Sequence, residues 1–141
     1  MKILIRAFKI NINLKITNYE ETGFLIACKY YSLEIVELLL EKYPGIINQK
    51  GNYGWTGFMY SCEHNSLKVV ELLLEKYPDI INQKNNDGWT GFLFACRYNS
   101  LEVVKLLLEK YPDIINQKNN NGRTGYDFLS EDSKRVIADY I

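Results

Sequence analysis

The sequence predicts an all-α solenoid, a stack of helix-turn-helix units with finger-like β-turn loops between them. The first observation is a repeat of 34 residues, clearest in DGWTGFLFACRYNSLEVVKLLLEKYPDIINQKN at residues 87–119. Self-similarity at a fixed period of about 20–50 residues indicates a stacked repeat protein. The second observation is that each unit holds two apolar segments of helical length, separated by polar turns. Three residue types recur at the 34-residue spacing: Gly54, Gly88 and Gly122; Pro44, Pro78 and Pro112; Cys28, Cys62 and Cys96.

The repeats divide a single domain, residues 1–141, into five segments. From Phe8 to Thr17 apolar and polar residues alternate strictly, which alone is a strand pattern. The place of this segment before the first full copy favours a worn half-repeat instead. The last segment carries a polar second helix, SKRVIADYI, which suits an outer face that no further repeat covers. The predicted segments are an N-terminal half-repeat at 1–17, full repeats at 18–51, 52–85 and 86–119, and a C-terminal capping repeat at 120–141.

Each full repeat is predicted to begin with a polar turn and a short buried helix. Asp87-Gly88 is a strong turn dipeptide, and a threonine follows it as a candidate helix N-cap. The helix after Thr90 is apolar on nearly every side, which indicates burial against more than one neighbour. The candidate caps are Thr22, Thr56 and Thr90.

The second helix of each repeat is predicted to be longer and amphipathic. In the third copy its leucines and valines share one half of the helix, whereas Glu102, Lys105 and Glu109 lie on the opposite strip. The dipeptide Tyr111-Pro112 ends the helix, because proline cannot continue the hydrogen-bond ladder. Serines are expected to cap these helices at Ser32, Ser66 and Ser100.

Composition excludes several classes of function. The 17 basic residues balance 17 acidic ones, and no basic stripe is visible, so nucleic-acid binding is not expected. Charges interrupt every apolar run, so no membrane-spanning segment is predicted. Arg6 and Lys9 interrupt the apolar part of MKILIRAFKI, which argues against a signal peptide. We therefore expect an intracellular protein, in the cytoplasm.

The segment GWTGFLFACRYNSLEVVKLLLEKYPDIINQKN resembles the ankyrin repeat, whose core pattern is Gly-x-Thr-Pro-Leu-His-x-Ala followed by Val-Val-x-Leu-Leu-Leu. The resemblance covers about residues 18–141 and implies an ankyrin solenoid. The Asn-, Tyr- and Lys-rich copies are similar to ankyrin proteins of giant DNA viruses and protists, so the expected cytoplasm is a host's if the chain is viral. Two departures from the pattern predict looser fingers. Glycine replaces the proline at Gly23, Gly57 and Gly91, and Leu25, Met59 and Leu93 replace the histidine and its hydrogen bonds.

The cysteines and the lone histidine do not predict chemistry. Neighbouring helices lie about 8–10 Å apart, which is farther than a disulfide allows, so buried reduced thiols are the better interpretation. His64 follows Cys62 by two residues, and such residues point to different faces of a helix. No catalytic residue, metal ligand or cofactor is predicted, and the chain is not expected to be an enzyme.

The resemblance implies a protein-protein interaction module that binds its partner, a host protein if the chain is viral, as a monomer. In ankyrin repeats the first helices and the turns before them form the concave binding face. For the two tryptophans, recognition of a partner and packing over their own turn are equally favoured. The alternatives are a folded remnant of an expanded family with no specific partner, and the substrate-recognition part of a larger adaptor assembly. The face implied here comprises Tyr19, Glu21, Lys29, Tyr30, Tyr53, Trp55, Glu63, His64, Asp87, Trp89, Arg97, Tyr98, Asn121 and Arg123.

Overall fold

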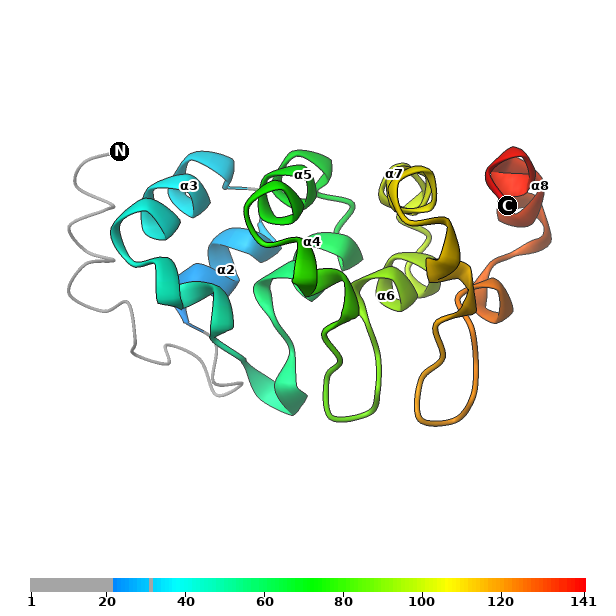
Figure 1. The fold of residues 1–141 in the computed structure, drawn as a ribbon, viewed down its shortest axis with the longest axis horizontal. Coiled ribbons are helices and arrows are strands. Elements are labelled where there is room, and N and C mark those ends of the chain that lie inside the picture. Colours follow the sequence, from blue (N-terminus) through cyan, green and yellow to red (C-terminus); the bar gives the residue numbers. More distant parts are fainter. Residues whose placement is uncertain (1–21, 31) are drawn as a thin grey trace.

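The computed structural model describes residues 22–30 and 32–141, and these form a helical solenoid (Figure 1). The predicted half-repeat at 1–17 lies outside the described residues. One row of helices holds the longer second helices and a parallel row holds the short first helices (Figure 1). The described α-helices are α2 (Gly23–Lys29), α3 (Leu33–Lys42), α4 (Gly57–Glu63), α5 (Leu67–Lys76), α6 (Gly91–Arg97), α7 (Leu101–Lys110) and α8 (Glu131–Ile137). The all-α solenoid predicted from the sequence is therefore confirmed.

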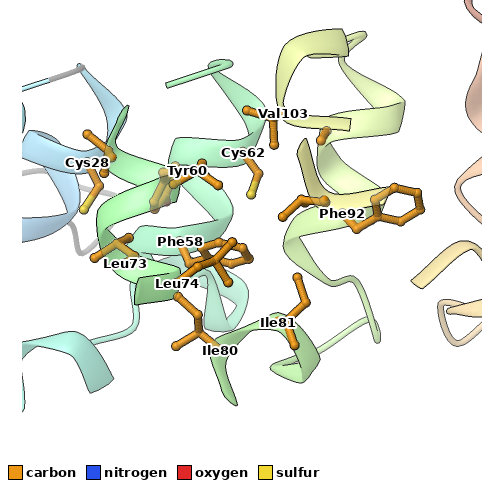
Figure 2. Close-up of a cluster of buried hydrophobic side chains, with 14 of the residues drawn as sticks. Cys28, Phe58, Tyr60, Cys62, Leu73, Leu74, Ile80, Ile81, Phe92 and Val103 are labelled. Atoms are coloured by element: carbon orange, nitrogen blue, oxygen red, sulfur yellow. The ribbon is translucent and has the colours of Figure 1, made fainter. Parts of the chain in front are cut away.

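The core runs unbroken through the stack. Helix α4 packs against α2 on one side and α6 on the other, and each second helix covers its own first helix. Phe58 and Phe92 from successive repeats are both buried, and so are Leu73 and Leu74 on α5 (Figure 2). Each second helix ends before its Tyr-Pro pair, as predicted, and a 3-10 turn follows from the proline.

The joint between repeats explains the glycines that stand where the family pattern has proline. A Cβ atom on Gly57 would lie 2.7 Å from the ring of Phe24 and 2.8 Å from the sulfur of Cys28. On Gly91 it would lie 2.4 Å from Phe58. Real Cβ atoms essentially never approach so closely, so glycine is required at this joint. The phenylalanine and cysteine of one repeat occupy the space that a side chain of the next would need.

The predicted caps are right for the first helices and wrong for the second. Thr90 Oγ1 accepts a hydrogen bond from the N–H of Leu93, and the other two threonines act alike. None of the three serines caps its helix. The Ser100 hydroxyl instead donates to the carbonyl of Glu63, 2.7 Å away in the preceding repeat. Asn65 Oδ1, also from that repeat, accepts from the N–H of Val103. The start of α7 is thus capped from its neighbour.

Glutamine and asparagine side chains make the hydrogen bonds that the missing histidine would otherwise supply. Gln117 Oε1 accepts from the hydroxyl of Thr90 at 2.8 Å, and its Nε2 donates to the carbonyl of Ile81 in the preceding repeat at 3.1 Å. Asn85 Oδ1 accepts from two N–H groups of its finger, at distances of 3.0 and 2.9 Å. The predicted loss of hydrogen bonds in the fingers is therefore compensated by glutamine and asparagine.

Candidate binding face

Most residues of the binding face predicted from the sequence lie in the part of the chain that the structure describes. Tyr19 and Glu21 lie outside the described residues. The other predicted residues come from the ends of the first helices and from the finger loops. We call this set of twelve the first-helix face: Lys29, Tyr30, Tyr53, Trp55, Glu63, His64, Asp87, Trp89, Arg97, Tyr98, Asn121 and Arg123.

Three tyrosines project from this face. Tyr30 is 62% exposed, Tyr53 64% and Tyr98 54%, which is unusual for large rings in a protein with a closed core. Tyr53 stands in the first finger with φ of 57°, a left-handed conformation that non-glycine residues seldom adopt. Tyr30 stacks on His64 of the next repeat, with ring centroids 6.3 Å apart. The ring of Tyr30 is therefore supported from the neighbouring repeat.

The two tryptophans belong to a row of rings that crosses the repeats. Trp55 packs between Tyr60 of its own repeat at 4.9 Å and Phe94 of the next at 3.9 Å. Trp89 packs in the same way between Phe94 at 5.0 Å and Phe128 at 4.7 Å. Each ring also keeps a partly exposed edge. The tryptophans thus join successive repeats, a role wider than covering their own turn.

Arg123 ends the row. It stands 34 residues after Trp89, and its guanidinium lies 4.4 Å from the ring centroid of Phe128. A cation over a ring face is attracted by the ring quadrupole, so Arg123 covers the last ring where another tryptophan would stand. Nearby, the carboxylate of Asp127 accepts the N–H of Thr124 at 2.8 Å, and this hydrogen bond lowers the pKa of Asp127.

A hollow of about 340 Å³ opens on the first-helix face where three repeats meet. One wall is Tyr53 in the finger, and Tyr98 at the end of α6 also lines it. We call it the Tyr53–Tyr98 hollow. Its lining residues are Lys29, Asn52, Tyr53, Trp55, Tyr60, Glu63 and Tyr98.

Sequence reasoning missed two of the lining residues. These two residues are Asn52 and Tyr60. A signal for Tyr60 exists, since an aromatic residue follows each tryptophan by five positions, at Tyr60 and Phe94. Of those two rings, only Tyr60 carries a hydroxyl group.

The cysteines lie inside the stack, away from this face. Cys28, Cys62 and Cys96 are free thiols and are buried (Figure 2 labels the first two). Burial raises the pKa of the Cys28 thiol to about 12 and also raises the pKa of the Cys62 and Cys96 thiols. Thiolates are the reactive form of cysteine, so these side chains are poor nucleophiles and poor metal ligands at neutral pH.

Comparison with known proteins gives a consistent result. A family model described as Ankyrin repeats (3 copies) matches residues 1–84, and a second model, described as Ankyrin repeat, matches residues 87–117. No curated protein matches the chain significantly. Among the described residues, no helix has the length and apolar character needed to cross a membrane.

Proposed function

Because the chain belongs to the ankyrin repeat family, we propose that it binds a partner protein through the first-helix face. Ankyrin repeats are generally protein-protein interaction modules, and the family is typically non-enzymatic. Solenoids bind partners through such extended surfaces. Tyrosine, tryptophan and arginine, the residues most enriched in interface hot spots, make up much of this face.

One observation carries the proposal: the surface differences between two nearly identical repeats. Residues 52–85 and 86–119 differ at only eight of 34 positions, three of them buried. On the second helix, the ion pair Lys68–Glu71 at 3.6 Å becomes Glu102–Lys105 at 3.8 Å, so these two differences compensate each other.

The three remaining differences all fall on the first-helix face. They replace Tyr53 by Asp87, Glu63 by Arg97, and His64 by Tyr98. None of these replacements preserves charge and shape together. Such changes are expected of a surface that a partner reads, because they alter recognition while leaving the core intact.

We further propose that the chain acts as a monomer in the cytoplasm. The composition supports a viral source, in which case the partner is a host protein. A folded remnant without a specific partner is the alternative. The pattern of differences disfavours it, because the two differences on the second helix preserve an ion pair, whereas drift alone would also leave uncompensated changes there.

The test compares two double-alanine variants, one on the first-helix face and one on a second helix, for their affinity for the same partner. The chain is immobilised, a partner is captured from cytoplasmic extract and identified by mass spectrometry, and its affinity for variants is then measured by calorimetry. Arg97→Ala with Tyr98→Ala should weaken binding by about 2 kcal/mol or more, as hot-spot truncations do. Glu102→Ala with Lys105→Ala should change it by less than about 0.5 kcal/mol.

Both variants must melt close to the parent chain for the comparison to report on binding. Loss of affinity in the second variant alone would place the interface on the second helices and refute the proposal. Failure to capture any partner that binds the purified chain would favour the remnant.

A further inference from the structure

The Tyr53–Tyr98 hollow has a chemistry of its own within the first-helix face. Resting on the proposed function, we propose that it receives an arginine side chain from a basic segment of the partner protein. The arginine would enter between the two tyrosines, stack on the rings and face the carboxylate of Glu63.

The walls provide the first half of this argument. Four of the seven lining residues are aromatic: Tyr53, Trp55, Tyr60 and Tyr98. Tyr53 and Tyr98 are largely exposed, so their rings are accessible from solvent. Guanidinium groups stack on tyrosine and tryptophan, and the ring quadrupole attracts their charge. No other side chain combines a planar cation with a long apolar stem that can reach into a recess.

The charges provide the second half. Glu63 supplies the carboxylate of the hollow, and it lies at the last residue of α4. Its side chain is about four-fifths buried, with Oε1 3.7 Å from His64 Nε2. A carboxylate at the edge of an aromatic recess matches the fork geometry of arginine, which can donate two parallel hydrogen bonds to it.

A positively charged side chain of the protein, that of Lys29, already lies beside the rings of the hollow. Lys29 Nζ lies 5.7 Å from the ring centroid of Tyr60 and 5.6 Å from that of Tyr30. The rings therefore accept a positive charge here. Lys29 would also repel an entering arginine, so it acts as an internal competitor. This predicts that removing the Lys29 charge tightens binding.

The equivalent position one repeat further on lacks this chemistry. There Asp87 replaces Tyr53 and Arg97 replaces Glu63, and the last repeat has the short 3-10 turn Tyr126–Phe128 in place of a first helix that could present a ring as Tyr98 does. The aromatic wall on the finger is lost, and the residue at the position of Glu63 becomes a cation. Within residues 22–30 and 32–141, the proposed arginine subsite therefore belongs to the junction of the repeats at 18–51, 52–85 and 86–119.

The test needs no natural partner. The full chain labelled with ¹⁵N is titrated with N-acetyl-arginine-amide, and the indole N–H signal of Trp55 is followed by NMR. The Trp89 indole signal, one repeat away, serves as the internal reference. N-acetyl-citrulline-amide is the neutral control of matched shape, and N-acetyl-glutamate-amide tests whether Lys29 attracts an anion instead. Arginine should shift the Trp55 signal saturably and bind at least about fivefold more tightly than citrulline.

Variants separate the contributions. Glu63→Gln and Tyr98→Ala should each weaken arginine binding severalfold, and Lys29→Met should strengthen it. Glu102→Gln makes the same charge change outside the hollow and should leave binding unchanged. An unmoved Trp89 signal in the free variants reports that the fold is intact.

Several results would overturn the proposal: equal binding of citrulline and arginine, preference for the glutamate probe, or no Trp55 shift in either the parent chain or Lys29→Met. If arginine does not bind but partner binding still depends on Arg97 and Tyr98, only the assignment of arginine as the ligand is refuted and the proposed function stands. Arginine binding together with a partner insensitive to those residues would refute the proposed function and leave the subsite.

Discussion

The 34-residue repeats keep the same residues at the joint, where one repeat packs against the next, but differ from one another on the first-helix face. At the joint, Gly57 meets Phe24 and Cys28, and Gly91 meets Phe58 and Cys62 in the same arrangement. On the face, corresponding positions carry tyrosine against aspartate and glutamate against arginine. Interiors packed at crystal-like density tolerate little change of volume, whereas a solvent-facing position tolerates most residues. Constancy at the joint therefore reports packing, and variation on the face reports what each repeat contacts outside the stack.

The largest predicted effect concerns the joint and follows from the raised pKa values of its thiols. The pKa of Cys28 is about 12 in the folded chain, and the pKa values of Cys62 and Cys96 are also raised. At a pH between the ordinary thiol pKa and these raised values, the folded chain therefore binds more protons than the unfolded chain. Stability is therefore full below the ordinary thiol pKa and falls as pH rises above it. Three thiols should together reduce the free energy of unfolding by about 3 kcal/mol from pH ~9 to ~10.

Urea unfolding at a series of pH values measures this slope. The variant with Cys28, Cys62 and Cys96 all changed to alanine is the control, because it keeps the ionisation of tyrosine and lysine. A parent chain and a control with the same slope would show that the thiols are not buried as the structure describes.

The next effect comes from the glycine of the joint. Gly91→Ala should lower the free energy of unfolding by about 2 kcal/mol, because its Cβ would overlap the ring of Phe58. Gly45→Ala is the matched control, since a Cβ there meets nothing within 4 Å. It should be neutral or stabilising by up to about 1 kcal/mol. Thermal unfolding of both variants gives the comparison, and equal melting temperatures would contradict the tight joint.

A smaller effect distinguishes two glutamines in equivalent positions. Gln117 bridges Thr90 and the carbonyl of Ile81, whereas the Oε1 atom of Gln83 is buried without a hydrogen-bond partner. Gln117→Ala should therefore destabilise the chain by about 1 kcal/mol more than Gln83→Ala. Chemical unfolding of the two variants measures the difference. A larger loss for Gln83→Ala would mean that its amide is bonded in solution in a way the structure does not describe.

The sequence predicted the period, the helices and the threonine caps, because these depend on local pattern and recur in every copy. It did not predict the serine geometry, the role of Gln117 or the row of rings through Trp55. In each of these, the deciding contact is made with an atom in a neighbouring repeat, about one period away in sequence. Periodicity tells which residues are equivalent. It does not tell how far a side chain reaches across the joint.

The same limit applies to the candidate site. All twelve residues of the first-helix face stand at positions that the repeat pattern could assign in advance, but the hollow arises only when three repeats come together. Lys29, Glu63 and Tyr98 stand in different repeats, and their shared recess depends on the spacing of the stack. The chemistry of the face can therefore be anticipated from sequence, whereas its concavities cannot.

The smallest predicted change in stability concerns Gly51 and Tyr60, which lie where the joint meets the first-helix face. Gly51 stands where the later fingers have Asn85 and Asn119, whose Oδ1 atoms each accept two backbone N–H groups. A Cβ on Gly51 would lie 3.4 Å from the hydroxyl of Tyr60, and the later repeats have phenylalanine in place of that tyrosine. The small residue and the added hydroxyl are thus expected to depend on each other.

A double-mutant cycle tests this dependence. Gly51→Asn alone should be neutral or slightly destabilising, because its Cβ would lie 3.1 Å from Leu25 Cδ1 and its amide would have to fit beside the Tyr60 hydroxyl. In the Tyr60→Phe background the same change should stabilise the chain, because the asparagine can then bond its finger as Asn85 does. The coupling energy between the two positions should be about 0.5–1 kcal/mol, within the range seen for residues in contact. Simple additivity in chemical unfolding would show that the two positions do not depend on each other.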